Sequence, residues 1–166
     1  VLSHEEIANI ITASGTGAMD ATINNIVFPE DRVLIVNGGA FGHRFKDICD
    51  FYKINSYNFK VGFGKRIDLG ELRMAIQEFK PSIILIQHVE TSSGQRYDIK
   101  EVGILCKEMG AKFIVDAIGS FGNDEYKIDE WNVDATLFSS HKGLGLFSGT
   151  SAIILNKKLY SGSFAK

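Results

Sequence analysis

The sequence predicts an α/β protein of three layers (α/β/α), in which helices cover both faces of a mostly parallel central sheet. Short apolar runs alternate with longer segments whose apolar residues recur at helical spacing. Several of the short runs are apolar throughout, which is typical of strands buried on both faces by crossover helices. Right-handed strand–helix–strand connections then predict adjacent parallel strands, with ligands bound at their carboxyl ends.

Seven segments have the pattern of a strand. The runs Arg-Val-Leu-Ile-Val-Asn at 32–37 and Ser-Ile-Ile-Leu-Ile-Gln at 82–87 are apolar between polar ends. Glycines or polar loops follow most of the runs and mark where the strands stop. The predicted strands cover residues 7–12, 32–37, 56–61, 82–87, 112–115, 135–138 and 150–155.

Four helices are predicted between these strands. The third and fourth begin at Asp-x-x-Glu capping boxes, which start at Asp68 and Asp98. Gly110 is placed to end the fourth helix, because glycine accepts the left-handed conformation of that position. The helical spacing of apolar residues extends over 18–27, 41–52, 72–79 and 102–106.

Size and composition indicate one well-packed domain that acts on a small molecule. The chain has 166 residues, and its 18 basic and 20 acidic residues are spread along it, which gives no electrostatic footprint for nucleic acid or a membrane surface. No apolar run approaches the roughly 20 residues that span a bilayer. Cys49 and Cys106 fall within helical patterns, so we expect reduced core thiols rather than a disulfide or a metal site, and a cytoplasmic location.

The most informative stretch is Phe-Ser-Ser-His-Lys-Gly-Leu-Gly at 138–145. It places Lys142 in a loop of small residues directly after a short strand, where an amine can stand free of packing. Asp116 follows another apolar run, where a buried carboxylate needs a cationic partner. A lysine that forms a Schiff base and an aspartate that keeps a pyridine nitrogen protonated are the two groups of a pyridoxal phosphate site. Taken alone, a lysine in such a loop is usually a solvated surface residue, and an aspartate after a strand is often only a helix cap.

Other features follow strands at the same predicted edge of the sheet. A glycine turn at 14–17 feeds a helix, and the unpaired N–H groups of a helix start suit a phosphate, although a simple N-cap has the same pattern. Phe41 begins the helix after the second strand, where it could stack on a flat ring or serve only as core. The loop 88–94 is dense in hydroxyl groups. Because all these features share one edge, each gains weight from the others.

Together the motifs resemble the class V aminotransferases, pyridoxal phosphate enzymes of fold type I that include alanine–glyoxylate, serine–pyruvate and 2-aminoethylphosphonate transaminases. The matching motifs occur in family order and extend over nearly the whole chain. They are Ser-Gly-Thr-Gly-Ala-Met from Ser14, Val-Asn-Gly-Gly-Ala-Phe-Gly-His-Arg from Val36, His-Val-Glu-Thr-Ser-Ser-Gly from His88, Val-Asp-Ala-Ile-Gly-Ser-Phe-Gly from Val115 and Ser-Ser-His-Lys from Ser139.

The resemblance implies a role for each matched residue. Lys142 and Asp116 would be catalytic: Lys142 forms the internal aldimine with pyridoxal 5'-phosphate and later shuttles a proton, and Asp116 pairs with the ring nitrogen. The implied reaction moves an amino group from a small amino acid or aminophosphonate to a 2-oxo acid, in a homodimer and without a metal. The implied cofactor-binding residues are Ser14, Gly15, Thr16, Gly17, Ser139 and His141 at the phosphate, Phe41 on the ring face, Thr91 at the phenolic oxygen, and Asp116 and Lys142.

The chain departs from the family pattern in three places. Neither the family's N-terminal arm nor its small C-terminal domain, which carries the arginine for the substrate carboxylate, is recognisable. We therefore expect residues 1–166 to form a single cofactor-binding large domain that is incomplete at its N-terminus and lacks the small domain. His141 precedes the lysine and Gly-Leu-Gly-Leu-Phe follows it, where many relatives have a polar residue and prolines.

Three alternatives stay open on the sequence. A lyase or desulfurase of the same fold would need the same lysine and aspartate and also a mobile catalytic cysteine, whereas both cysteines fall in helical patterns. A nucleotide-binding module is suggested by Gly-Gly-Ala-Phe-Gly at 38–42, but the acidic residue expected at the end of the next strand is missing. The chain could also be a catalytically inert domain that only binds a cofactor or a partner.

Overall fold

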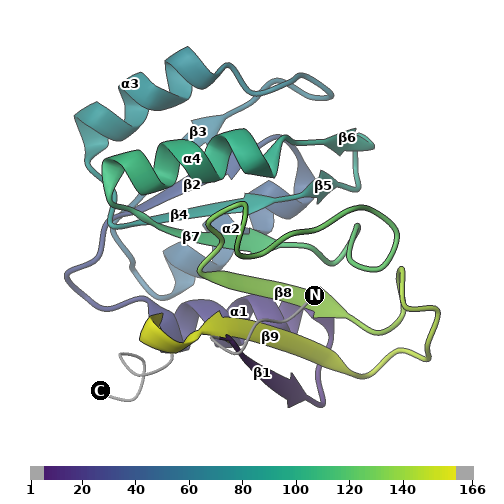
Figure 1. The fold of residues 1–166 in the computed structure, drawn as a ribbon. Helices are drawn as coiled ribbons and strands as arrows, with labels where there is room; N and C mark the ends of the chain where they lie inside the picture. The colour runs from purple at the N-terminus through teal and green to yellow at the C-terminus, as the bar shows by residue number, and fades with distance from the viewer. Residues whose placement is uncertain (1–5, 160–166) are drawn as a thin grey trace.

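The computed structural model describes residues 6–159 and has the predicted three-layer α/β architecture (Figure 1). The elements are, in chain order, β1 (Glu6–Ile11), α1 (Gly15–Ile26), β2 (Val33–Asn37), α2 (Ala40–Phe51), β3 (Ser56–Lys60), α3 (Leu69–Phe79), β4 (Ile83–Gln87), β5 (Val89–Glu90), β6 (Gln95–Arg96), α4 (Ile99–Met109), β7 (Lys112–Asp116), β8 (Ala135–Ser139) and β9 (Ser151–Asn156). No helix within residues 6–159 is long and apolar enough to cross a bilayer.

The central sheet has seven strands in the order β1-β9-β8-β7-β4-β2-β3. The strands from β8 to β3 are mutually parallel, and β9 runs antiparallel to both of its neighbours. Consequently β1 points the same way as the parallel strands, and the glycine turn that follows it lies at their carboxyl edge. The fold class is confirmed, and the antiparallel β9 is why the sheet is mostly rather than wholly parallel.

Two apolar clusters fill the spaces on the two sides of the sheet. Alternate residues of each strand face opposite ways, so one side packs against α1 and α2 and the other against α3 and α4. Figure 1 shows α3 and α4 on the near side of the sheet and α1 and α2 on the far side. Both predicted core cysteines are buried and unpaired, Cys49 in α2 and Cys106 in α4.

The helix boundaries follow the predicted capping chemistry. The Asp68 carboxylate accepts hydrogen bonds from the N–H groups of Gly70 and Glu71, and that of Asp98 accepts one from Glu101. Gly110 ends α4 in the left-handed region, with φ of 71°. Local sequence therefore sets where these helices start and where α4 stops.

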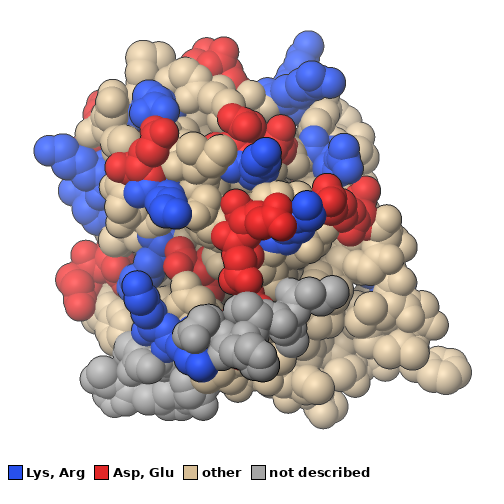
Figure 2. All heavy atoms as spheres, viewed as in Figure 1, with Lys and Arg blue, Asp and Glu red and all other residues tan. Residues whose placement is uncertain are grey.

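The structure adds one element that the sequence pattern did not predict. β5 and β6 form a two-stranded antiparallel hairpin inside the polar loop after β4. The face drawn in Figure 2 carries intermixed basic and acidic side chains rather than a patch of one sign.

Candidate active site

A row of polar residues ends the parallel strands on the side of the sheet that α1 and α2 cover. The four residues are Asn37 of β2, Gln87 of β4, Asp116 of β7 and Ser139 of β8. Two positions earlier on each strand, the same side carries Ile35, Leu85, Ile114 and Leu137, which belong to the apolar cluster beneath α1 and α2. The sheet therefore changes from apolar to polar at its carboxyl edge, where ligands bind in folds of this kind.

Asp116 is a buried carboxyl without a cationic partner. Its side chain is 4% exposed, and its Oδ1 accepts a hydrogen bond of 2.8 Å from the N–H of Ile118. No ion pair joins it to any residue of the described range 6–159. Burial raises its pKa from 3.8 to about 7, and the Ile118 bond and the charge of Arg44 only partly oppose that rise. A cation placed at this carboxylate would restore its charge.

The start of α1 is an open helix N-terminus at the same edge. Ser14 caps it by accepting a hydrogen bond from the N–H of Gly17, and no acidic residue lies in its first turn. A Cβ on Gly15 would lie 2.5 Å from Cδ1 of Ile118, so glycine at this position lets the helix start lie against the loop after Asp116 without displacing the Ile118 side chain. The predicted phosphate turn and the predicted ring partner are thus held side by side.

The start of α2 is occupied by a carboxylate of the chain itself. Glu90, which is fully buried, accepts hydrogen bonds from the N–H groups of Phe41 (3.1 Å) and Gly42 (3.0 Å) and from the hydroxyl of Ser92. An internal anion therefore satisfies the helix start that the nucleotide-binding alternative would use for a phosphate. Since α3 and α4 carry aspartate caps, α1 is the one helix among α1 to α4 whose start has no carboxylate.

Arg44 connects the two helices at this edge. Its Nη1 donates a hydrogen bond of 2.9 Å to the hydroxyl of Thr16 in α1, and its guanidinium lies 4.6 Å from the ring centroid of Phe41. Phe41 is only half-buried, so its ring is not simply core. The exposed Thr91 lies in the loop after β5, and its hydroxyl is close to Gly119 in the turn after Asp116.

Ser139 faces inward in this structure. Its hydroxyl lies 2.7 Å from the hydroxyl of Ser151 on β9, which in turn donates to the carbonyl of Ala13 just before the α1 turn. Ser139 therefore ties the end of β8 to the loop that carries Ser14. The residue is 3% exposed and its hydroxyl is already partnered, in contrast to the open start of α1.

The lysine loop after β8 is anchored at its base by Ser140, while the side chains of His141 and Lys142 stay exposed. Ser140 bonds to Phe147 and Thr150 across the base of the loop, and the N–H of Gly145 bonds to the carbonyl of Lys142. A Cβ on Gly143 would lie 2.3 Å from the carbonyl oxygen of Phe121, so the loop packs tightly on the turn after β7. Lys142 itself is exposed, which leaves its amine free to reach a ligand at the edge.

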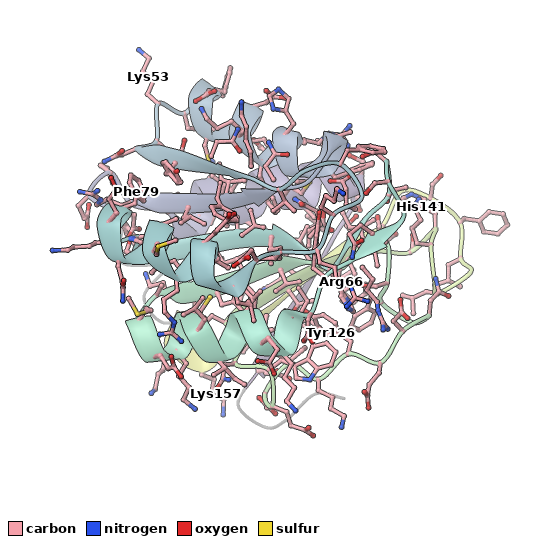
Figure 3. The ribbon with its side chains drawn as sticks, turned by 90° about the horizontal axis from the view of Figure 1, so that it is seen from above. Lys53, Arg66, Phe79, Tyr126, His141 and Lys157 are labelled. Atoms are coloured by element: carbon pink, nitrogen blue, oxygen red, sulfur yellow. The ribbon has the colours of Figure 1, made fainter. Side chains whose placement is uncertain are left out.

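His141 is also exposed and marks the end of the molecule at which the site lies. Figure 3 shows it where the parallel strands finish, with Lys53 and Phe79 toward the opposite end. The structure thus brings the predicted residues to one edge, built from the start of α1, the start of α2, the loop after β5, the end of β7 and the loop after β8. It does not enclose them, because Thr16, Thr91, His141 and Lys142 are all exposed.

A separate cavity of about 710 Å³ opens on the α3–α4 side, away from these residues. His88 lines it, and its Nδ1 lies 2.8 Å from the Ser120 hydroxyl. Burial lowers the pKa of His88 to about 4, so the imidazole is neutral at physiological pH. None of the predicted site residues lines this cavity.

Neither cysteine of the chain has the properties of a nucleophile. Burial raises the pKa of Cys49 to about 12 and raises that of Cys106 as well, so both remain protonated thiols. Both lie within helices rather than in a loop near Lys142. The geometry of this chain therefore gives no support to the desulfurase alternative.

Sequence reasoning assigned no role to Glu90, Arg44, Gln87 or Ser151. A signal existed for Gln87, because it is a polar residue at the end of a buried strand, and for Glu90 only in its place in the polar loop that follows. No local signal identifies Arg44 or Ser151, since their partners lie 28 and 138 residues away in the sequence. These contacts exist only in the folded chain.

The known proteins similar to this chain include transaminases that differ in their amino donor. The chain is 32% identical over 149 residues to the (S)-ureidoglycine–glyoxylate transaminase of Bacillus subtilis, covering 90% of this chain and 36% of the relative. It is 30% identical over 151 residues to the 2-aminoethylphosphonate–pyruvate transaminase of Salmonella paratyphi A, covering 90% and 41%. The chain thus spans about two fifths of the length of the curated relatives it matches.

A solved structure and a family model agree with these relatives. The alanine–glyoxylate aminotransferase of Nostoc sp. superimposes with a TM-score of 0.92 at 34% identity, covering 99% of this chain and 44% of that one. The family model described as aminotransferase class-V matches residues 2–162. On this evidence the chain belongs to the class V aminotransferases, a family that depends on pyridoxal phosphate.

Proposed function

We propose that this chain is the cofactor-binding part of a pyridoxal phosphate-dependent aminotransferase. In the reaction, an amino group passes from a small amino acid or an aminophosphonate to a 2-oxo acid. The observation that carries the proposal is Asp116, a buried carboxyl that forms no ion pair with any described residue and stands beside an open helix start. A ligand that carries both a protonated pyridine and a phosphate fits both features: the pyridinium would pair with the Asp116 carboxylate, and the phosphate would bind the start of α1.

The residues present fit the cofactor at each of its polar ends. Asp116 would hold the proton on the ring nitrogen, and the backbone N–H groups of Gly15, Thr16 and Gly17 would bind the phosphate. Ser14 caps this turn and holds it in place. The hydroxyl of Thr91 would donate to the phenolic oxygen.

Three further predicted residues, Phe41, Ser139 and His141, complete the proposed cofactor site. Phe41, held by Arg44, would cover one face of the ring. Ser139 supports the phosphate turn from below through Ser151 and Ala13, and His141 would approach the phosphate from the exposed lysine loop.

Catalysis depends on two of these residues. When bound, pyridoxal phosphate supplies an aldehyde carbon that captures amines and a protonated ring that withdraws electrons from the substrate. Lys142 would hold the cofactor through that carbon and then, as a neutral amine, take the proton from Cα of the substrate and return it to the cofactor carbon, two bonds away across the substrate nitrogen. Asp116 would stabilise the developing negative charge by keeping the ring nitrogen protonated.

Absorption spectroscopy of the full-length protein tests the proposal. Added pyridoxal phosphate should give the wild type a band near the visible edge, and borohydride should remove this band and leave the cofactor covalently attached to the protein. In Lys142→Ala borohydride would reduce only the free aldehyde, so the cofactor should be released on denaturation, and the variant should not transaminate. The matched control is Lys107→Ala, which removes an exposed lysine of α4 far from the edge and should behave as the wild type. Wild-type turnover by Lys142→Ala would refute the assignment of Lys142.

The amino donor is identified by a substrate panel. Alanine, serine, aspartate and 2-aminoethylphosphonate should each be paired with pyruvate and with glyoxylate, and one donor should exceed the others in kcat/KM. A protein that gains no absorption band with pyridoxal phosphate would instead favour the inert-domain alternative.

The homodimer and the cytoplasmic location also belong to this proposal. Leu144, Leu146 and Phe147 of the lysine loop are 41%, 63% and 97% exposed, an apolar tip that a second copy could cover beside the site. Figures 1 and 2 share one view, and the loop between β8 and β9 lies at the lower right in both. In Figure 2 this part of the surface carries few charged side chains. The two free thiols support a reducing compartment. Sedimentation of the full-length protein would test the dimer, and a monomer at micromolar concentration would refute it.

A further inference from the structure

Gln87 is a fully buried amide whose hydrogen-bonding groups have no partner. It ends β4 with 0% of its surface exposed, and neither Nε2 nor Oε1 bonds to any residue that the structure describes. Buried polar side chains are normally satisfied, because an unpaired one keeps its full desolvation cost. We therefore expect the amide at this position to serve something other than the stability of the chain alone.

The position of Gln87 joins it to the candidate site. In the parallel pairing of β4 with β7, Gln87 is the partner of Asp116, and adjacent strands lie about 4.8 Å apart. Both side chains point to the side of α1 and α2, since Leu85 and Ile114, two positions before them, belong to that cluster. On its other side Gln87 meets the first turn of α2, where a Cβ on Gly42 would lie 3.1 Å from Oε1. The amide is thus confined between Gly42 and Asp116.

Asp116 has a carboxylate oxygen that lacks a hydrogen-bond donor, and the amide of Gln87 could supply one. Its Oδ1 accepts from Ile118, and no described residue donates to its other oxygen. An ionised carboxylate can accept several hydrogen bonds, and a glutamine Nε2 offers two donors. Gln87 therefore has N–H donors without an acceptor, and Asp116 beside it has a carboxylate oxygen without a donor.

We propose that Gln87 is a positioning residue for Asp116, whose second carboxylate oxygen accepts a hydrogen bond from Nε2 when the ring nitrogen of the cofactor is bound. This inference rests on the proposed function. A neutral amide suits the role, because it orients the carboxylate and favours its ionised form without neutralising the charge that must pair with the ring. A lysine or arginine here would compete with the ring nitrogen for that charge.

The test compares Gln87→Met, which keeps a similar volume but has no donor, with the wild type as full-length protein. Two quantities are measured: the thermal midpoint of the cofactor-free protein and the Kd for pyridoxamine 5'-phosphate, which carries the ring nitrogen but cannot bond covalently to Lys142. The apo midpoint should stay equal or rise, because an unpaired buried amide is removed. The Kd should increase about tenfold, the size expected for a lost hydrogen bond to a charged group.

Two further variants separate positioning from a general structural role. In an Asp116→Asn background, Gln87→Met should change the Kd less than about twofold, because the two residues act on one interaction. Thr136→Val is the matched control: Thr136 is also 0% exposed but faces the other side of the sheet and bonds to the Tyr126 hydroxyl at 2.9 Å. That control should lower the apo midpoint and leave the Kd unchanged.

The outcomes distinguish this inference from the proposed function. If Gln87→Met lowers the apo midpoint as the control does and leaves the Kd unchanged, Gln87 is only structural and the inference is wrong. The inference also fails if the full tenfold loss persists in the Asp116→Asn background. A wild-type protein that binds neither pyridoxamine phosphate nor pyridoxal phosphate would instead overturn the proposed function itself.

Discussion

Replacing Asp116 with asparagine should stabilise the cofactor-free protein above neutral pH, even though it damages the proposed site. Burial raises the pKa of Asp116 from 3.8 to about 7, so the folded chain holds this proton more tightly than the unfolded chain does. Between these values the native state binds more protons, and stability therefore falls as the pH rises through this window. The asparagine side chain has no charge to desolvate, and its amide oxygen can still accept the hydrogen bond from the N–H of Ile118.

The size of the effect follows from the shift. A difference of about three pKa units corresponds to about 4 kcal/mol of lost stability, at 1.36 kcal/mol per unit, when the pH rises from below 4 to above 7. Part of that loss has already occurred at pH 5. Between pH 5 and pH 8 the variant should therefore gain about 3 kcal/mol relative to the wild type.

Urea unfolding of the apo forms at pH 5, 6, 7 and 8 measures this difference. The stability advantage of Asp116→Asn should grow with pH and level off above pH 7, and saturating pyridoxal phosphate should reverse it, because the ionised wild-type carboxylate then gains its cationic partner. A pH-independent difference between the two proteins would show that the carboxyl does not titrate in this range. A variant less stable than the wild type at pH 8 would refute the claim that Asp116 is an uncompensated buried charge.

Two other substitutions test the supports of the site. Glu90→Gln replaces the acceptor of the α2 start with a group that also carries N–H donors, so it should lower the free energy of unfolding by about 3 kcal/mol in urea titrations; a loss below about 0.5 kcal/mol would mean that the carboxylate is dispensable. Gly143→Ala forces a Cβ against the backbone of Phe121, so it should displace the lysine loop at a cost of about 1–3 kcal/mol and slow the appearance of the borohydride-sensitive band. An unchanged rate in Gly143→Ala would show that this packing does not position Lys142.

Much of the fold was predictable because its signals are local. Within residues 6–159, the apolar runs and helical spacing located the seven strands of the central sheet and helices α1 to α4, with ends that differ by a few residues. The caps at Asp68, Asp98 and Gly110 formed as predicted, since each depends on neighbours within three or four residues. The hairpin of β5 and β6 was missed because two-residue strands are too short to show a period.

The candidate site was predicted as a set of residues but not as an arrangement. Strand direction explains why two of these residues share an edge: Asp116 ends β7, and Lys142 lies in the loop after β8, which runs parallel to β7. The inward turn of Ser139 could not be foreseen, because it depends on Ser151 of the antiparallel β9. The roles assigned to the individual residues stay predictions until the variants above are measured.

The sequence by itself determined which polar and reactive residues follow the strands. The spacing of apolar residues and the residues that form turns are properties of short segments, so they can be read without the fold. Only the tertiary structure decided which helix start is open and which is filled. Glu90 reaches α2 across 48 and 49 positions of sequence, and Gln87 meets Asp116 through the register of two strands. Such pairings depend on how the elements pack, since burial makes an unpaired charge or amide costly wherever packing places it.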